Sequence, residues 1–156
     1  MRIFNRKQIK EVQELANKTY DANLELVEFA MLSTSKKEKL WVTNRGILEN
    51  DFKPMRLNSV GVYFGRIHHG KLRLSIEGAQ MVGKTAKKNV AEITKEQVWD
   101  FIRGFDVSTE TESLEENAYV LVKNNEDILG IAKYVSGTLE NILPKSRKLT
   151  SLTKPK

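Results

Sequence analysis

The segment from Ile128 to Arg147 constrains the fold of this chain most strongly. It opens with an apolar run of strand character, Ile128–Tyr134, and ends in a cluster of basic residues. A second apolar run, Ala118–Val122, precedes it, and the polar residues Asn124–Asp127 between the runs favour a turn. The sequence therefore predicts a β-hairpin whose continuation presents positive charge, a surface suited to a polyanion.

The basic end of this segment is expected to follow a fixed path. Asn141 suits polar contacts with the backbone, and Pro144 fixes its own φ angle. We therefore expect the ordered chain to reach about Leu149 and a flexible basic tail to occupy residues 151–156.

Capping residues predict three helices. A capping box pairs an N-cap Ser, Thr or Asn with a Gln or Glu three residues later, and Asn5–Gln8 and Thr94–Gln97 both fit this pattern. Ser75 is a further N-cap candidate. The predicted helices are Arg6–Thr19, Ile76–Val82 and a segment that follows Thr94 and ends at Gly104.

Short apolar runs predict the remaining strands and an α+β fold. The runs are Leu24–Phe29, Leu40–Thr43, Asn58–Phe64, Leu72–Leu74 and Val90–Ile93, with loops at Ser33–Lys37 and Ser108–Asn117 and a hairpin turn or linker at His68–Lys71. We expect a small α/β N-terminal unit over residues 1–66 and a compact, strongly bent sheet or small barrel with short helices over residues 67–150.

Composition excludes several classes of site. The 156 residues include no cysteine, so disulfides, thiolate zinc sites and cysteine nucleophiles are excluded. The only histidines, His68 and His69, are adjacent and would point to opposite faces of a strand, so no metal site is expected. No apolar run reaches the roughly 20 residues needed to cross a bilayer, and the N-terminus lacks the apolar core of a secretory signal. A cytoplasmic location is the expectation.

Charge is segregated along the chain. The formal net charge is +6 and the pI about 9.5. Residues 66–95 are mainly basic, residues 110–127 mainly acidic, and residues 145–156 contain no acid. Such segregation favours a nucleic-acid partner. The alternative is that the charged residues are simply a solvated surface and that the tail is frayed.

One motif suggests a nucleotide-binding loop. Gly78–Thr85 matches the phosphate-loop pattern G-x-x-x-x-G-K-[ST] letter for letter. That loop requires a buried strand before it and a packed helix after it, whereas Leu72–Leu74 is short and charged and Ala86–Asn89 has no apolar stripe. We expect a helix followed by a basic loop instead, and a nucleotide-binding enzyme is the weakest of three hypotheses.

Aromatic residues fall into two groups. Trp41 and Trp99 have apolar neighbours and are expected in the core. Tyr63, Phe64 and Tyr134 adjoin glycine or basic residues, and any of them could stack on an unpaired base.

Four stretches together resemble a known RNA-binding module. They are Leu74–Gln80, Phe101–Gly104, Leu129-Gly130 and Asn141–Arg147, the last reading Asn-Ile-Leu-Pro-Lys-Ser-Arg. They resemble a PUA-type domain and, more closely, the RNA-binding C-terminal region of Sun-like RNA cytosine-C5 methylases. The resemblance covers about Val60 to Leu149 and implies a PUA-like β pseudobarrel with short flanking helices. Those methylases use paired cysteines and a Gly-rich S-adenosylmethionine domain; this chain has neither, so the resemblance implies the RNA-binding part without the catalytic part.

The resemblance also implies which residues face RNA. In PUA-like folds the RNA-facing surface generally includes the first short helix and the last strand. Carried onto this sequence, it selects Lys84, Arg103, Lys133, Tyr134, Lys145 and Arg147. The lysines and Arg147 would contact phosphate, Arg103 phosphate or a base edge, and Tyr134 would stack.

The leading hypothesis is a non-catalytic RNA-binding protein, without a cofactor, that acts on structured tRNA or rRNA. The expected setting is tRNA modification, rRNA processing or ribosome biogenesis, alone or beside a separate RNA-modifying enzyme. The alternative is a protein-interaction adaptor of an RNA-modification or ribosome-assembly complex, in which the N-terminal unit docks on a partner and the basic tail is incidental.

Overall fold

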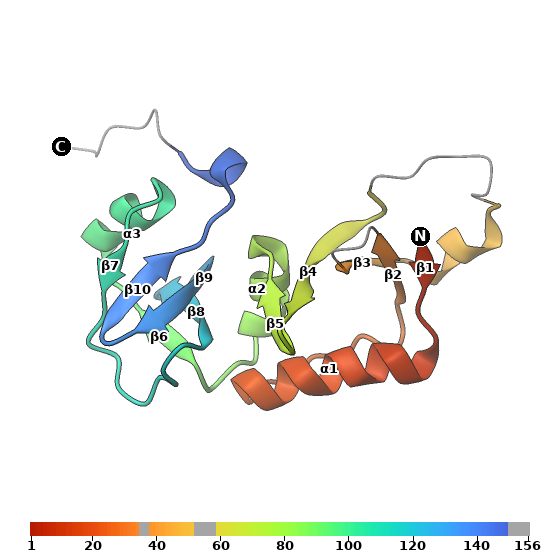
Figure 1. The fold of residues 1–156 in the computed structure, drawn as a ribbon, viewed down its shortest axis with the longest axis horizontal. Coiled ribbons are helices and arrows are strands. Elements are labelled where there is room, and N and C mark those ends of the chain that lie inside the picture. Colours follow the sequence, from red (N-terminus) through yellow and green to blue (C-terminus); the bar gives the residue numbers. More distant parts are fainter. Residues whose placement is uncertain (35–37, 52–58, 150–156) are drawn as a thin grey trace.

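Two sheets with a helix between them make up the fold (Figure 1). The computed structural model describes residues 1–34, 38–51 and 59–149. Sheet A is antiparallel, with strands in the order β1 (Arg2–Ile3), β2 (Ala30–Thr34), β3 (Lys39–Thr43), β4 (Val62–His68) and β5 (Lys71–Leu74). Sheet B has the order β6 (Val90–Glu92), β8 (Tyr119–Asn124), β9 (Asp127–Val135), β10 (Thr138–Asn141) and β7 (Val107–Ser108), and its β6–β8 pair is parallel. The helices are α1 (Arg6–Tyr20), α2 (Ile76–Gly83) and α3 (Lys95–Ile102), with 3-10 turns η1 (Arg45–Glu49) and η2 (Lys145–Arg147).

The helices begin where the capping residues predict. The backbone N–H of Gln8 donates to Asn5 Oδ1 and that of Asn5 donates to Gln8 Oε1, both at 2.9 Å, which completes the predicted capping box. Thr94 and Gln97 form the second box, and Ser75 caps α2. These three predictions are confirmed. None of the helices among the described residues is long and apolar enough to cross a membrane.

The predicted strand Leu24–Phe29 is wrong. This segment runs along α1, whose side chains occupy the backbone groups that a strand would pair: Asn17 Oδ1 accepts from Leu24 N at 2.7 Å, and Gln13 Oε1 accepts from Leu26 N at 2.6 Å. Strand β2 therefore begins only at Ala30. Ser33 and Thr34, predicted as loop, belong to this strand, and residues 35–37 lie outside the described ranges.

The other strands lie close to their predicted positions. Leu40–Thr43 and Leu72–Leu74 fall in β3 and β5, and the predicted hairpin around Asn124–Asp127 forms between β8 and β9. The strand predicted at Asn58–Phe64 starts later, at Val62, while Asn58 lies outside the described residues. The α+β class is confirmed, with a curled sheet B beside a β-rich N-terminal unit.

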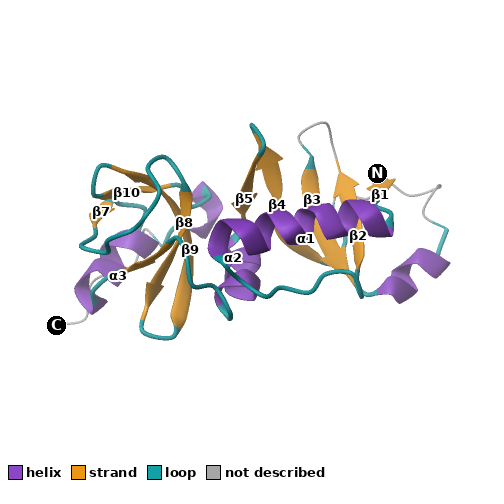
Figure 2. Cartoon of the chain, turned by 90° about the horizontal axis from the view of Figure 1, so that it is seen from below, coloured by secondary structure: helices purple, strands orange, loops and turns teal. Residues whose placement is uncertain are grey.

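One core joins the two sheets. α1 lies across the strands of sheet A and α2 stands between the sheets (Figure 2). Leu121 and Ile131 of sheet B belong to the same buried cluster as residues of α1, α2 and sheet A. Their neighbours Val120 and Ala132 point the other way, as alternation in a strand requires, and form a second core with Phe101 of α3. Sheet B is therefore buried on both faces, and its position relative to sheet A is fixed by packing.

The observed strands place the predicted end of the N-terminal unit in the middle of sheet A. The predicted boundary between residues 66 and 67 falls inside β4, and β4 pairs with β5 as far as Leu74. We therefore propose that the N-terminal unit extends through β5, with α2 as the element shared by both units.

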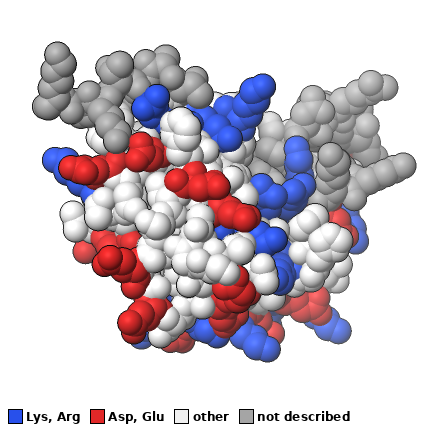
Figure 3. Space-filling view, turned by 60° about the vertical axis from the view of Figure 1, so that its left-hand side comes forward, with Lys and Arg blue, Asp and Glu red and all other residues white. Residues whose placement is uncertain are grey.

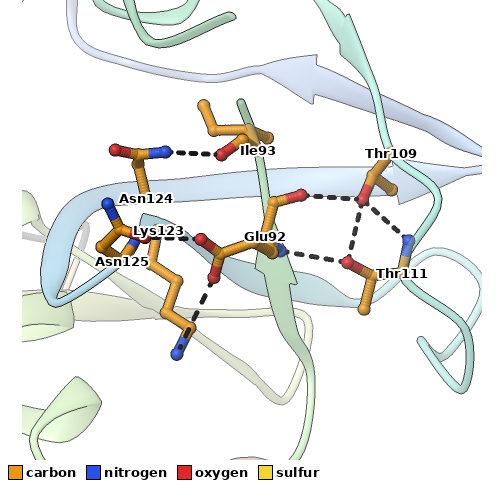
Figure 4. Close-up of polar contacts among 7 residues, drawn as sticks. All are labelled: Glu92, Ile93, Thr109, Thr111, Lys123, Asn124 and Asn125. Carbon is orange, nitrogen blue, oxygen red and sulfur yellow. Dashed lines mark hydrogen bonds and ion pairs between the residues drawn. The ribbon is translucent and has the colours of Figure 1, made fainter. Parts of the chain in front are cut away.

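A polar network holds the parallel strand β6 in place (Figure 4). The carboxylate of Glu92 accepts from Asn125 N at 2.8 Å, in the turn between β8 and β9. The backbone of Glu92 contacts the segment after β7. Its N–H donates to Thr111 Oγ1 at 3.0 Å, and its carbonyl accepts from Thr109 Oγ1 at 3.3 Å. The start of the acidic segment is thus tied to the sheet edge.

Tyr20 connects α1 directly to sheet B. Its side chain is fully buried, its hydroxyl donates to the Tyr119 carbonyl at 2.7 Å, and burial raises the pKa of Tyr20 above its usual range. Tyr20→Phe is expected to lower the free energy of unfolding by about 1–2 kcal/mol, because the partly buried Tyr119 carbonyl loses its donor. Urea unfolding measures this change. Tyr134→Phe is the control, since the Tyr134 hydroxyl makes no hydrogen bond to another described residue, and equal losses in both variants would contradict the assignment.

Candidate nucleic-acid interface

Asn141 fixes the path of the C-terminal segment. Its side-chain amide donates to the carbonyls of Phe101 at 2.7 Å and Phe105 at 3.1 Å, and its Oδ1 accepts from Leu143 N at 3.0 Å. Its backbone N–H donates to Asp106 Oδ1 at 2.7 Å. The chain leaving β10 is therefore bound to the end of α3, in agreement with the fixed path expected from the sequence.

The last described residues pack against the end of α3. Leu149 N donates to the Ile102 carbonyl at 2.9 Å. The Lys148 side chain covers Gly104, where an added Cβ would lie 2.5 Å from Lys148 Cδ. This arrangement brings η2, with Lys145, to the same side of the domain as Arg103 at the C-cap of α3.

Arg103 carries an unused donor. Its Nε is buried and has no hydrogen-bond partner among the described residues, and its guanidinium lies 5.5 Å from the centre of the Phe105 ring. The adjacent Gly104 has a positive φ of 98°. A guanidinium beside an aromatic ring can still use its Nη groups for a bidentate contact with phosphate.

Arg147 lies on the other side of η2, against α2. Its Nη1 donates to Glu77 Oε1 at 2.7 Å. Glu77 is in the first turn of α2, so the contact joins residues that are 70 positions apart in the sequence. The pair is partly exposed, and surface ion pairs of this kind contribute little to stability.

Lys133 and Tyr134 face opposite sides of sheet B. Lys133 pairs with Tyr119 on β8 and Glu140 on β10, on the face toward sheet A. Tyr134 pairs with Leu139 and packs on the second core, on the face toward α3. One RNA-binding face of this sheet therefore does not contain both side chains.

Lys84 lies apart from the other five residues. It is the C-cap of α2, beside Glu126 and Asp127. Glu77 and Arg147 lie at the opposite end of this helix, about 12 Å away for a helix of eight residues. The structure brings Arg103 and Lys145 to one region and Arg147 and Lys133 to another, and leaves Lys84 outside both.

The phosphate-loop motif has a structural role. Its first glycine, Gly78, is inside α2, where the helix packs directly on the backbone of β4, and its second, Gly83, is the last residue of the same helix. A phosphate loop needs its backbone N–H groups free and convergent. Here the N–H of Gly78 donates to Ser75 Oγ at 2.8 Å and that of Thr85 to the Val82 carbonyl at 3.3 Å. The motif match reflects close helix packing.

A cleft at the junction of the two sheets was not predicted from the sequence. It has a volume of about 230 Å³ and lies between β4, β5, the start of α2 and the chain around η2. We call it the junction cleft; its polar and aromatic lining is Tyr63, Arg66, Arg73, Ser75, Glu77 and Arg147. Arg73 Nη2 donates to the Ile142 carbonyl at 3.2 Å, which connects sheet A to the C-terminal segment.

The side chains that line the junction cleft carry a net positive charge. Three arginines line it, against the single carboxylate of Glu77. Burial raises the pKa of Tyr63, and Arg66 and Arg73 act against this increase because they stabilise the phenolate. The pKa of His68 is lowered, first by partial burial and then by the positive charges of His69, Arg66 and Arg73.

The sequence contains a pattern that predicts the pairing of two of the cleft arginines. His69 and Gly70 form a two-residue turn between β4 and β5, and such a turn fixes the register of the strands on both sides. Arg66 therefore has to lie opposite Arg73. Among the predicted stacking residues, Phe64 is wrong because it is completely buried, whereas Tyr63 is half-buried and lines the cleft.

The surface shows the charge segregation directly. In Figure 3, Lys and Arg side chains gather at the top and toward the right of the face and again along the bottom, whereas acidic side chains lie on the left and across the centre. Part of the acidic segment is neutralised locally, because Glu115 pairs with Lys88 and this contact lowers the pKa of the carboxyl. Within the described ranges, no group of three or more His, Asp or Glu side chains is placed to hold a metal ion.

Comparison with known families finds one family model that matches the C-terminal part of the chain. Residues 88–149 match the family model described as "Methyltransferase RsmF PUA domain". The matched range spans sheet B, α3 and η2, and includes Arg103, Lys133, Tyr134, Lys145 and Arg147. The unit thus resembles the C-terminal region of Sun-like methyltransferases, as the sequence motifs indicate. No curated protein matches the chain.

Proposed function

We propose that this protein binds structured tRNA or rRNA without catalysing a reaction itself. The observation that supports the proposal most is the match of residues 88–149 to the PUA domain of an RNA methyltransferase family. The setting we propose is RNA modification or ribosome maturation in the cytoplasm, beside a separate RNA-modifying enzyme.

The geometry supports some of the proposed RNA contacts more than others. Lys145, in η2, and Arg103, the C-cap of α3, both lie at the C-terminal end of α3. Lys133 and Arg147 lie toward the junction with sheet A. We propose phosphate contacts for these four residues. Lys84, beside two acids, and Tyr134, packed on the second core, are weaker candidates for RNA contact.

Crosslinking to cellular RNA tests the proposal and identifies the target. The wild-type chain is expected to recover tRNA or rRNA, and the variant Arg103→Glu/Lys145→Glu is expected to recover much less. Lys7→Glu/Lys10→Glu is the matched control, since these lysines are exposed on α1. Equal, background recovery from all three proteins would overturn the proposal, and recovery of proteins without RNA would favour the adaptor alternative.

A further inference from the structure

Sheet A carries three cations in register on one face. The β3–β4 register places Lys39 opposite Arg66, and the β4–β5 register places Arg66 opposite Arg73. We call these residues the cationic row. Neighbouring strands are about 4.8 Å apart, so the three backbone positions span only about 10 Å. Like charges directly opposite each other destabilise a sheet, so a functional role is expected for the three cations of this row.

The cationic row lies on the face of sheet A that α1 does not cover. Leu40, Leu72 and Leu74 belong to the core cluster shared with α1, and residues adjacent to them in a strand point away from that core. None of the row residues forms an ion pair within the described part of the chain, where the pairs are Lys10–Glu14, Lys88–Glu115, Lys123–Glu92 and Arg147–Glu77. Their charge is available to an external anion.

The row leads into the junction cleft and to the PUA domain. Arg66 and Arg73 line the cleft, and Arg147 enters it from η2. The Arg73 guanidinium also lies 5.9 Å from the centre of the Tyr119 ring, and Tyr119 is the cross-strand partner of Lys133. The positive surface therefore continues from β3 across the junction to the PUA domain.

Two aromatic rings lie beside the row. Trp41 and Tyr63 are cross-strand partners with ring centres 5.2 Å apart, and both are half-buried. The Trp41 indole N–H donates to Thr34 Oγ1 at 2.7 Å, which fixes the orientation of its ring. A sheet face that combines cations with partly exposed aromatic rings is a common platform for unpaired nucleic acid.

We propose that this face of sheet A binds an unpaired RNA strand that continues from the RNA held by the PUA domain. Lys39, Arg66 and Arg73 contact its phosphates, and Tyr63 contacts a base or sugar at the mouth of the cleft. The inference rests on the proposed function, because the strand is an extension of the same RNA. It assigns to the N-terminal unit a role in RNA binding in place of docking on a protein.

Fluorescence anisotropy with two RNA probes tests this proposal. One probe is a blunt RNA hairpin, and the other is the same hairpin with a single-stranded extension. The wild-type chain is expected to bind the extended probe about tenfold more tightly, a gain of about 1.4 kcal/mol. Arg66→Ala/Arg73→Ala is expected to lose this gain and to lower the salt slope on the extended probe by about 1.4, or about 0.7 for each lost phosphate contact with a single strand.

Matched variants separate this result from misfolding. Arg6→Ala/Lys7→Ala removes two charges from α1, on the other side of sheet A, and is expected to keep the tenfold gain. Tyr63→Leu is expected to reduce the gain while leaving the salt slope unchanged, because it removes a ring and no charge.

Three outcomes would overturn the proposal. If the extension adds no affinity for the wild-type chain, or if the arginine variant keeps the tenfold gain in affinity, sheet A does not bind RNA. Binding of the blunt hairpin would still leave the proposed function intact. If an acidic peptide competes with the extended probe but not with the blunt hairpin, the face is a protein-docking surface. If the wild-type chain binds neither RNA, the proposed function fails together with this inference.

Discussion

Gly78→Ala is expected to lower the free energy of unfolding by about 3 kcal/mol, the upper end of what overpacking usually costs and a large part of the roughly 5–15 kcal/mol typical of a domain. A Cβ at this position would lie 2.1 Å from the Phe64 carbonyl oxygen and 3.1 Å from its carbon. That oxygen already accepts from Ser75 N at 2.9 Å, so the backbone of β4 cannot move away without breaking the N-terminal connection of α2. The helix itself would have to shift, and it is the element on which both sheets pack.

Helix propensity alone gives the opposite sign for this substitution. Alanine is favoured over glycine inside a helix by about 1 kcal/mol, so the substitution would stabilise the protein if α2 had room for a Cβ at this position. Chemical unfolding of Gly78→Ala separates the two accounts. Gly46→Ala is the control, because its Cβ would have an ordinary contact of 3.4 Å with Asn44 Oδ1. A stabilised Gly78→Ala protein would show that the packing of α2 on β4 is wrong.

Asn141→Ala is expected to lower the free energy of unfolding by about 2–4 kcal/mol and to weaken RNA binding. The substitution removes the donor of two carbonyls, those of Phe101 and Phe105, and the acceptor of Leu143 N. These contacts attach the chain that carries η2 to the end of α3, so their loss releases Lys145 and Arg147 from their positions. The binding loss should exceed what the lower stability explains, because the loss comes from misplaced cations.

Hydrogen exchange and RNA titration together measure this effect. Leu149 N, which donates to the Ile102 carbonyl, is expected to lose its protection in Asn141→Ala. Asn23→Ala is the control: only the backbone N–H of Asn23 has a described contact, with Thr85 Oγ1 at 2.9 Å, and this contact survives the substitution. Unchanged protection of Leu149 would mean that Asn141 does not hold the C-terminal segment.

Local signals in the sequence predicted local structure well. The capping boxes at Asn5–Gln8 and Thr94–Gln97 and the hairpin around Asn124–Asp127 depend on residues within a few positions of each other, and all three are confirmed. The failure at Leu24–Phe29 has a tertiary cause, because side chains of α1 satisfy the backbone that looked like a strand. No pattern within that segment contains this information.

The candidate site was harder to predict because it depends on the arrangement of distant elements. The resemblance to PUA domains is confirmed over residues 88–149, the range that the family model matches. The contact of Arg147 with Glu77 and the opposite faces of Lys133 and Tyr134 follow from packing and register. The pairing of Arg66 with Arg73 followed from a short turn, but its importance appears only when the junction cleft places Arg147 beside them.

The salt dependence of RNA binding tests the central claim most directly. The account predicts that the affinity of the full chain for a structured tRNA or rRNA fragment falls steeply as salt increases, and that Lys145→Ala lowers the slope by about one unit while Lys7→Ala leaves it unchanged. Undetectable binding at low salt, or binding with the same slope in all three proteins, would contradict the account.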